Sequence, residues 1–422
     1  MKKFSNFDFS AASDRCVKCG KCKPVCTIFG ISGDEAKSPR GFLDLLGAYH
    51  RGELALDKNA KKIFESCFLC TSCTSVCTNE LPTDELIENV RADIAAKFGI
   101  AWYKRAFFYL LRHRAVMDAA ARLGYVFQSC GFKIQESGMK ARFPMPMVKM
   151  ERLLPSAKKR SFMNSHPEFV DFGGSKTVGI FIGCMANYAY SEIGEGLLKI
   201  CAATKINAHL MKEQACCAAP AYFTGDFATV RANATKNIEY FEKMLSKLDA
   251  IVIPEATCAA MIRVDYARFF ANEPEWAERA RKVAGKIFMA SEYFAKYSNL
   301  NEILTSKGGA KLAKVAYHDP CHARKVQGVW KEPRELLGAI YDVKNTADTS
   351  ACCGFGGVTM QSENYHLSRA VGLRRAAQLE ETGADVASAE CSACKMQLNN
   401  SLNLAGSKMR CKNWVELVAE AL

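Results

Sequence analysis

The chain contains no apolar run near the roughly 20 residues that a helix needs to cross a bilayer. Its most lipid-like stretch, residues 106–111, is short and lies between Arg105 and Arg112. The first ten residues, MKKFSNFDFS, include two lysines but lack the apolar region that follows them in a secretory signal. These absences disfavour secretion and membrane spanning, and we expect a cytoplasmic protein.

Nucleotide-binding fingerprints are lacking as well. The stretch with Gly354, Gly356 and Gly357 has neither a P-loop lysine nor the GxGxxG order, and no flavin or nicotinamide fingerprint occurs elsewhere. We therefore expect the chemistry on an organic substrate to lie on another chain. No recognition motif accompanies the formal charge of +13, so nucleic acid is not expected as a partner.

Cysteine is what the chain has in abundance, with 20 among 422 residues. A disulfide scaffold would be short and secreted. This chain is long, and its 49% hydrophobic and 24% charged residues are typical of a folded protein of two or three domains. In a reducing compartment, closely spaced thiols at this density indicate metal ligands or redox chemistry.

Two cysteine runs near the start share the spacing C-x2-C-x2-C-x3-C, and the second lies 51 residues after the first. Such runs bind 4Fe–4S clusters, with the fourth cysteine on the other cluster. The spacing predicts one cluster on Cys16, Cys19, Cys22 and Cys77, and another on Cys67, Cys70, Cys73 and Cys26. Structural zinc is the alternative, although it usually shows paired C-x2-C knuckles. Thr27 and Thr78 replace the usual following proline, a change expected to alter potentials and preserve ligation.

A second, larger repeat covers the rest of the chain. Apolar stretches run into cysteines at 177–184 and 251–258, and again at 314–321 and 385–394, with helix-like stretches at 191–203 and 367–382. This alternation favours an α/β unit with a mainly parallel sheet in each half. Four cysteines of one half recur 136 or 137 residues later, which indicates a duplication: Cys184, Cys216, Cys217 and Cys258 correspond to Cys321, Cys352, Cys353 and Cys394.

The two halves differ in their ligand sets. Cys391 forms C-x2-C with Cys394 and gives the second half five thiols, whereas Glu255 stands at the matching place in the first half. The cysteine pair of the first half is followed by Ala218 and that of the second by Gly354. The second half therefore offers one thiol more than a cubane needs, and the first offers four thiols and a carboxylate.

Together these motifs resemble the iron–sulfur subunits of the glycolate oxidase type. The resemblance extends to the C subunit of anaerobic glycerol-3-phosphate dehydrogenase and to the D subunit of heterodisulfide reductase, and it covers nearly the whole chain. Besides the two runs, it rests on SPRG at 38–41, FIGCMANY at 181–188, YHDPCH at 317–322, CCGFGG at 352–357 and the final NWVELVAEAL.

The expected fold is a multidomain α+β chain. A helical stripe of Phe42, Leu45, Leu46 and Tyr49 between the two runs supports a helical ferredoxin domain. The expected domains are a ferredoxin domain with two 4Fe–4S clusters at 1–100, a basic helical linker at 101–175, a first cysteine-rich CCG domain with an incomplete motif at 176–305, and a second with a complete motif at 306–422.

The resemblance implies an electron-transfer subunit of an oxidoreductase, beside an FAD-containing dehydrogenase that oxidises a 2-hydroxy acid such as glycolate or lactate. Electrons would pass to quinone or another carrier. The alternatives are the C subunit of an anaerobic glycerol-3-phosphate dehydrogenase, or a heterodisulfide-reductase-like catalytic subunit that reduces a disulfide at a noncubane iron–sulfur cluster. That third cluster would lie on Cys321, Cys352, Cys353, Cys391 and Cys394.

The first CCG motif departs from the family pattern, so its occupant stays open between a cluster, zinc and nothing. A zinc ion there would use four thiols, or three thiols plus Glu255, and would give that half a docking role. The four thiols concerned are Cys184, Cys216, Cys217 and Cys258.

Several other residues have two interpretations. His318 and His322 flank Cys321, where they can donate to cluster sulfurs or relay protons, and ordinary turn histidines are the alternative. Gly354, Gly356 and Gly357 are expected to let the backbone approach a cluster closely. The cysteines outside every motif are expected to be small buried hydrophobes, and they are Cys130, Cys201 and Cys411.

The basic segment from about 104 to 160 mixes aromatic residues with arginine and lysine near its start. One hypothesis is a surface helix that touches anionic lipid or a membrane anchor, which would make the protein peripheral on the cytoplasmic face of the inner membrane. The alternative is a core-packed connecting helix with a solvated basic face.

Overall fold

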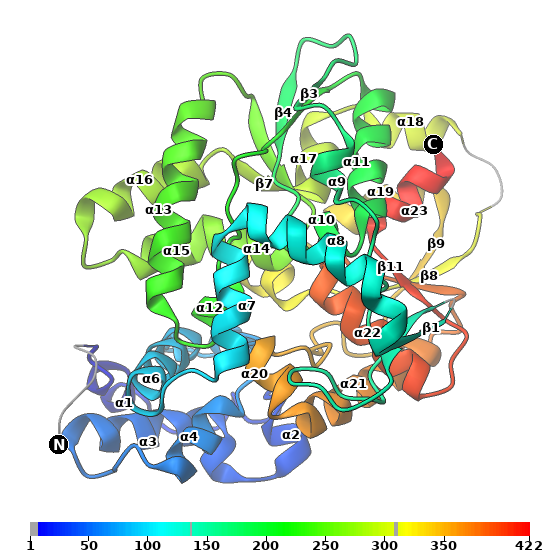
Figure 1. The fold of residues 1–422 in the computed structure, drawn as a ribbon. Coiled ribbons are helices and arrows are strands. Elements are labelled where there is room, and N and C mark those ends of the chain that lie inside the picture. The colour runs from blue at the N-terminus through cyan, green and yellow to red at the C-terminus, as the bar shows by residue number, and fades with distance from the viewer. Residues whose placement is uncertain (1–6, 136, 308–310) are drawn as a thin grey trace.

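The computed structural model describes residues 7–135, 137–307 and 311–422, so the first six residues of the lysine-containing start lie outside the described part. In Figure 1 the N-terminal helices form the bottom of the molecule, two linker helices cross its front, and two sheet-containing halves lie above and to the right. This mixture of helices and sheets confirms the predicted α+β class.

The N-terminal part is built of short helices joined by cysteine-bearing loops. Helix α3 begins at a Ser38 N-cap, whose side chain accepts a hydrogen bond from the Gly41 N–H. It buries Phe42, Leu46 and Tyr49 of the predicted stripe. A Cβ at Gly41 would lie 2.0 Å from the Glu35 carbonyl oxygen, which explains the glycine of SPRG. The elements are α1 (Ser10–Asp14), α2 (Phe29–Ser32), η1 (Glu35–Lys37), α3 (Pro39–Arg51), α4 (Lys58–Glu65), α5 (Ser72–Ser75) and α6 (Thr83–Phe98).

The linker is helical only in its first part, which corrects the expectation of a helical linker up to residue 175. Helices α7 (Trp102–Arg112) and α8 (Arg114–Gly131) are followed by an antiparallel hairpin of β1 (Phe132–Gln135) and β2 (Gly138–Ala141). An irregular stretch with Pro144, Pro146 and Pro155 then leads to α9 (Phe162–Ser165). Proline removes a helical hydrogen bond, so this part of the linker cannot continue as a helix.

The first cysteine-rich half contains a five-stranded sheet of order β3-β5-β4-β6-β7, parallel except for its edge strand β3. Its strands are β3 (Phe169–Val170), β4 (Thr177–Ile180), β5 (Asn207–Leu210), β6 (Ala250–Ile253) and β7 (Ile287–Met289). Its helices are α10 (Cys184–Tyr188), α11 (Ser191–Thr204), α12 (Ala219–Tyr222), α13 (Phe227–Met244), α14 (Ala256–Ala260), the π-helix η2 (Met261–Asp265), α15 (Tyr266–Phe269), α16 (Pro274–Ala284), α17 (Ala290–Tyr297) and α18 (Leu300–Ser306).

The second half repeats this sheet. Its order β9-β8-β10-β11 matches β5-β4-β6-β7 strand for strand, and every pair is parallel, as predicted for a duplication. Its strands are β8 (Lys314–Tyr317), β9 (Asp342–Lys344), β10 (Val386–Ser388) and β11 (Cys411–Lys412). Its helices are the π-helix η3 (His322–Val326), α19 (Glu332–Ile340), α20 (Gly357–Ser362), α21 (Tyr365–Glu380), α22 (Ser392–Leu404) and α23 (Trp414–Ala421).

The two halves are interlocked. Helix α23, drawn in red beside α11 in Figure 1, packs on α11 of the first half, where a Cβ at Gly196 would lie 2.8 Å from Val415 Cγ1. The buried Glu390 carboxylate accepts from the backbone N–H of Ser291, and the Ala256 N–H donates to the Glu390 carbonyl at 3.0 Å. These contacts bring the cysteine-bearing ends of the two sheets together. Within the described part of the chain, no helix has the length and apolar character needed to cross a membrane.

Candidate metal centres

The second cysteine run begins in a tight loop between α4 and α5, continues with Cys73 in α5 and ends with Cys77 after it. Leu69 and Thr71 adopt left-handed φ angles of 51° and 56°, and 51 residues earlier Lys18 and Gly20 do the same at 55° and 81°. Such angles are uncommon for residues other than glycine. The two runs therefore share a backbone conformation as well as a spacing.

Four thiols of the ferredoxin part line one small cavity, and they are Cys26, Cys67, Cys70 and Cys73. Burial raises the pKa of Cys26 to about 12, and the nearby Cys67 and Cys70 charges add to the shift. Metal ions compensate thiolate charges that burial otherwise disfavours, so this donor set fits a cluster. The Thr27 hydroxyl lies 3.3 Å from Cys70 Sγ, which gives the residue in the usual proline position a contact with a thiol.

The other four thiols of this part lie closer to the surface. Cys19 is exposed, while Cys16, Cys22 and Cys77 are partly buried. Two hydrogen bonds join Arg15 to Asn79, at 2.7 and 3.3 Å, and so hold the chain next to Cys16 beside the chain next to Cys77. Ligation of a cluster by this set stays a prediction.

In the second CCG half, three loops bring five buried thiols together. Cys321 precedes η3, Cys352 and Cys353 lie between β9 and α20, and Cys391 and Cys394 lie at the start of α22. The Sγ atoms of Cys353 and Cys394 are 3.4 Å apart. A hydrogen bond with Cys394 lowers the pKa of Cys391 to about 7. A thiol of this kind gives up its proton readily and suits metal ligation.

His318 lies against this set. It is fully buried, and its Nδ1 accepts a hydrogen bond from Arg375 Nε at 3.1 Å. Burial lowers the pKa of His318, and a ring nitrogen of His318 and the Sγ atoms of Cys353 and Cys394 lie within 4.8 Å of one another. A neutral ring whose Nδ1 is an acceptor carries its proton on Nε2, so His318 can donate to a ligand sulfur. His322 instead stacks on Phe223, with ring centroids 5.5 Å apart.

The glycines near these cysteines allow neighbouring segments of the protein to pack closely against each other. The sequence had instead suggested that they let the backbone approach a cluster. A Cβ at Gly354 would lie 2.9 Å from the Ser368 carbonyl of α21, and one at Gly356 would lie 2.8 Å from the Phe68 ring of the ferredoxin part. Ala218 takes a φ of 71° where Gly354 has 87°, so the alanine keeps the turn of the first half.

The four thiols of the first CCG half also converge. Cys217 and Cys258 have Sγ atoms 3.2 Å apart, and Cys184 lies beside Cys216. Glu255 does not complete this set, because its carboxylate accepts from both the backbone N–H and the hydroxyl of Ser392, at the start of α22 in the other half. Burial raises the pKa of Glu255 to about 8, and the neighbouring Cys391 charge adds to it. The option of three thiols plus Glu255 for zinc is therefore disfavoured.

One apolar cavity of about 240 Å³ lies between the two CCG halves and the ferredoxin part. Aromatic side chains from all regions line it, including Phe68, Phe107 and Phe223. Gln361 and His322 are among its polar groups. Nine cysteines also line it, and they are Cys70, Cys184, Cys217, Cys258, Cys321, Cys352, Cys353, Cys391 and Cys394.

The three cysteines outside the motifs divide into two kinds. Cys201 and Cys411 are buried, as expected of small hydrophobes, but Cys130 at the end of α8 is exposed, so the expectation was wrong for this residue. Helix α8 packs too loosely to bury it. All twenty cysteines are free thiols.

Comparison with known families agrees with this arrangement. A family model described as a 4Fe–4S dicluster domain matches residues 12–81. A second, described as a cysteine-rich domain and named CCG, matches twice, at 178–263 and 315–399. The chain joins a 4Fe–4S dicluster domain to two CCG domains. The dicluster match spans both cysteine runs, and each CCG match extends five residues beyond the last motif cysteine of its half.

Curated relatives carry the same combination of names that the motifs suggested. The chain is 27% identical to a probable glycolate oxidase iron–sulfur subunit of Bacillus subtilis, over 96% of this chain and 93% of the relative. It is 30% identical to the C subunit of the anaerobic glycerol-3-phosphate dehydrogenase of Escherichia coli, over 58% and 59%. Lactate utilization protein A of Halalkalibacterium halodurans is 26% identical over 57% and 96%. Along almost its whole length the chain is thus similar to a protein named as an iron–sulfur subunit.

Two features of the site were not anticipated from the sequence. Cys70 of the dicluster domain lies beside Cys352 of the second CCG domain, at the wall of the same cavity, although 282 residues separate them. Lys325 lies at the same junction, with its ammonium 3.8 Å from Cys321 Sγ. The sequence held one indication of this contact: Lys325 follows Cys321 by four residues, the spacing of neighbours on one side of a helix.

Proposed function

We propose that this chain carries electrons from an FAD-containing dehydrogenase, which oxidises a 2-hydroxy acid such as glycolate or lactate, to quinone or another carrier. The observation that carries the proposal is that Cys70 and Cys352 lie close enough for their thiols to influence each other, and both line the same cavity. It links a ferredoxin set of thiols to the second CCG set. The thiol sets therefore form a series that begins at exposed Cys19 and ends at the apolar cavity.

In this proposal the two ferredoxin sets hold 4Fe–4S clusters, and the five thiols of the second CCG domain hold a third iron–sulfur cluster. Such clusters supply one-electron chemistry and need no proton-transferring side chain. The protein's own part is to hold the thiolates, exclude water from them and donate hydrogen bonds to them. His318 lies beside Cys353 and Cys394 with its Nε2 available as a donor, and Thr27 contacts Cys70. The four thiols of the first CCG domain would hold a further cluster or a zinc ion.

A partner chain follows from the same reasoning. The names of two relatives are those of subunits, one of a glycolate oxidase and one of a glycerol-3-phosphate dehydrogenase. The present sequence has no flavin or nicotinamide fingerprint of its own. The oxidation of the organic substrate is therefore assigned to the partner, and this chain to the transfer of electrons in the cytoplasm.

The cavity favours one alternative function. Thiols of both CCG domains line the same apolar space, which has room for a small organic group. A disulfide substrate held there would meet the five-thiol set and receive electrons from the dicluster domain. This is a heterodisulfide-reductase-like catalytic role, and it differs from the first proposal in requiring turnover at the second CCG set.

Replacement of Cys391 with serine separates the two functions. We expect the intact chain, purified without oxygen, to contain more than about eight irons, the number that two cubanes hold. Cys391→Ser is expected to lose iron from the second CCG set alone, with the EPR signals of the two ferredoxin clusters unchanged. Loss of all disulfide turnover would support the alternative function. Substantial remaining dye-linked activity with the flavoprotein partner, and no disulfide turnover by either protein, would support the electron-transfer function.

The linker supports a membrane-peripheral location. Of the fourteen exposed large hydrophobic residues in the described part, ten lie between Trp102 and Met150. Helix α8, all of whose residues are described, has no buried residue. This corrects the alternative of a core-packed helix for α8, whereas α7 buries Phe108 and Leu111. Exposed basic residues accompany this surface, and they include Arg105, Arg112, Arg122, Lys133, Arg142 and Lys149.

We name residues 102–150 the linker surface and propose that it docks on anionic lipid at the cytoplasmic face of the membrane. Apolar and basic side chains together are typical of helices that lie in a membrane interface. Basic residues near an anionic bilayer each add about 1 kcal/mol of attraction. Phe107 and Met147 of this surface also line the cavity, which brings a lipid-soluble acceptor within reach of the thiol sets.

Liposome flotation tests this location. The protein is expected to float with vesicles that contain anionic lipid at low salt and to stay unbound with neutral vesicles. The double variant V126D/F127D, on the exposed side of α8, is expected to lose binding by about tenfold or more, since charge near lipid removes apolar contact area. Leu312→Asp, another exposed apolar residue outside the linker surface, is the matched control. Equal flotation of V126D/F127D and the control would remove the proposal.

A further inference from the structure

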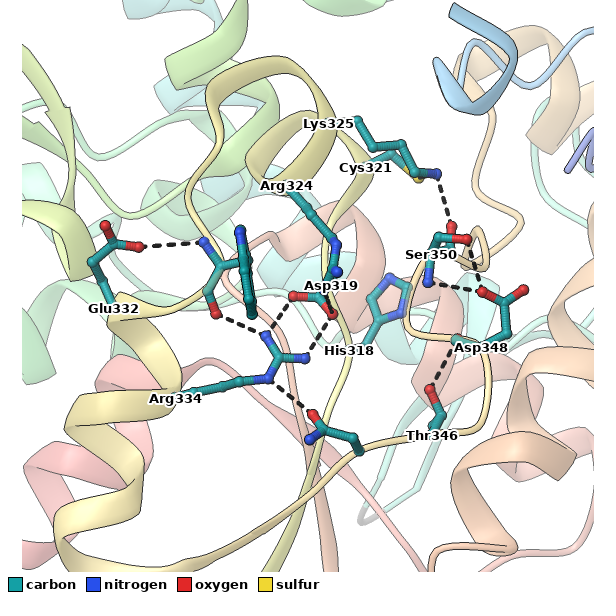
Figure 2. A network of polar contacts seen from close by, with 12 residues as sticks. His318, Asp319, Cys321, Arg324, Lys325, Glu332, Arg334, Thr346, Asp348 and Ser350 are labelled. Carbon is teal, nitrogen blue, oxygen red and sulfur yellow. Dashed lines mark hydrogen bonds and ion pairs between the residues drawn. The ribbon is translucent and has the colours of Figure 1, made fainter. Parts of the chain in front are cut away.

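Lys325 joins the dicluster domain to the second CCG domain. Its ammonium donates to the Ser72 hydroxyl at 2.5 Å and to the Cys70 carbonyl at 3.3 Å, both in the dicluster domain. It also donates to the Ser350 carbonyl at 2.7 Å and lies 3.8 Å from Cys321 Sγ. Figure 2 shows the side chain running from η3 past Cys321 toward Ser350. One cation therefore touches both thiol sets of the junction.

The charged groups drawn around Lys325 have other partners. Arg324 and Arg334, its basic neighbours in Figure 2, both pair with the buried Asp319 carboxylate. Asp348, the acidic side chain nearest in Figure 2, accepts instead from the N–H and hydroxyl of Ser350. The ammonium donates to three oxygen acceptors, on Ser72, Cys70 and Ser350, which uses the three donors of a charged lysine. The positive charge therefore lies between the two thiol sets.

The first CCG domain lacks this cation. The residue 137 positions before Lys325, the offset that relates Cys321 to Cys184, is Tyr188, whose hydroxyl donates to Asp118 at 2.8 Å. The two domains thus share a fold and a set of thiols but differ here. The lysine is present in the domain whose Cys352 meets Cys70 of the dicluster domain. This difference points to a role for Lys325 in the junction between the dicluster domain and the second CCG domain. If Lys325 supported the fold that both CCG domains share, the first domain would need the same lysine.

We propose that Lys325 tunes electron transfer across this junction by raising the reduction potentials of the groups held on both sides of it. The proposal rests on the electron-transfer function above. One electron leaves the cluster on Cys26, Cys67, Cys70 and Cys73 and arrives at the cluster on the second CCG set, and no atom or proton is transferred. A fixed positive charge between the two favours the reduced, more negative state of each. Lys325 keeps its proton throughout and acts through the sulfur ligands.

The test is a redox titration of the whole, cluster-loaded chain, followed by EPR. Lys325→Met is expected to lower the equilibrium constant for one-electron reduction of the junction clusters by about tenfold, a shift of about 59 mV to lower potential. Lys325→Arg, which keeps the charge, is expected to restore most of the shift. Lys104→Met is the matched control, since Lys104 is a buried lysine that contacts Thr359 and Glu363 instead of thiols.

Iron content and thermal unfolding are measured on every variant. Lys325→Gln, which retains a hydrogen-bond donor, replaces Lys325→Met if the latter loses iron. Unchanged potentials in Lys325→Gln or Lys325→Met with full iron content would overturn the proposal, and so would an equal shift in Lys104→Met. Failure of the wild-type chain to accept electrons from any flavoprotein would count against the proposed function alone, because the potentials are measured without a partner.

Discussion

Cys67→Ser is expected to abolish electron flow through the chain. Serine is a poor ligand for iron, and Cys67 belongs to the four thiols that line the small cavity of the dicluster domain. We expect the loss of about four irons per chain and a fall of more than about 100-fold in electron transfer to the natural acceptor. Replacing a residue that only hydrogen-bonds to a metal ligand already lowers metal affinity or activity by about 10- to 100-fold. Iron analysis and partner-linked turnover measure the two effects.

Cys201→Ala is the control for this experiment, because Cys201 is a buried thiol of α11 outside every ligand set. It is expected to keep its iron and its turnover and to lose only a little stability. If electron flow persists in Cys67→Ser that lacks the cluster, the series of thiol sets does not describe the route of the electrons.

Arg91→Met is expected to separate the dicluster domain from the first CCG domain. The buried Arg91 guanidinium donates to the Cys67 carbonyl at 2.7 Å and to the Phe64 carbonyl at 3.3 Å, and across the interface to the Phe223 carbonyl at 2.9 Å. Each buried carbonyl left without a donor costs about 1–3 kcal/mol. We expect a loss of roughly 3 kcal/mol or more, visible as a lower urea midpoint and faster release of iron.

Arg122→Met on α8 is the matched control, since Arg122 is exposed. An exposed substitution of this kind is expected to change stability by no more than about 0.5 kcal/mol. The interface is also closed by backbone, because a Cβ at Gly225 would lie 2.2 Å from the Arg91 carbonyl oxygen. A urea midpoint for Arg91→Met equal to that of the control would show that the guanidinium does not hold the two domains together.

The repeats and the fold class could be predicted from the spacing of the cysteine motifs. The offset of 51 residues predicted two matching runs, and Lys18 and Leu69 share a backbone conformation. The offset of 136 or 137 predicted a duplicated unit with a mainly parallel sheet, and the two sheets have the same order for four strands. Periodic patterns of this kind depend on local geometry, which the sequence carries directly.

The contacts between the domains could not be predicted from the spacing of the motifs. The meeting of Cys70 with Cys352, and of Glu255 with Ser392, depends on how separately folded units dock, and no local pattern encodes that. The linker shows the same limit, because its sequence allowed either a buried or an exposed helix. The packing of distant elements determines whether α8 is buried in the core, and none of its eighteen residues is buried.

The packing of α23 on α11 has a consequence for the order of biosynthesis. About 210 residues separate the end of α11 at Thr204 from the start of α23 at Trp414, and at 5–20 residues per second they take roughly 10 to 40 s to translate. During that interval the nascent first half exposes Ile193 and Leu197, which the finished protein buries with Trp414 and Val418. The interface between α11 and α23 therefore closes only after α23 has been made.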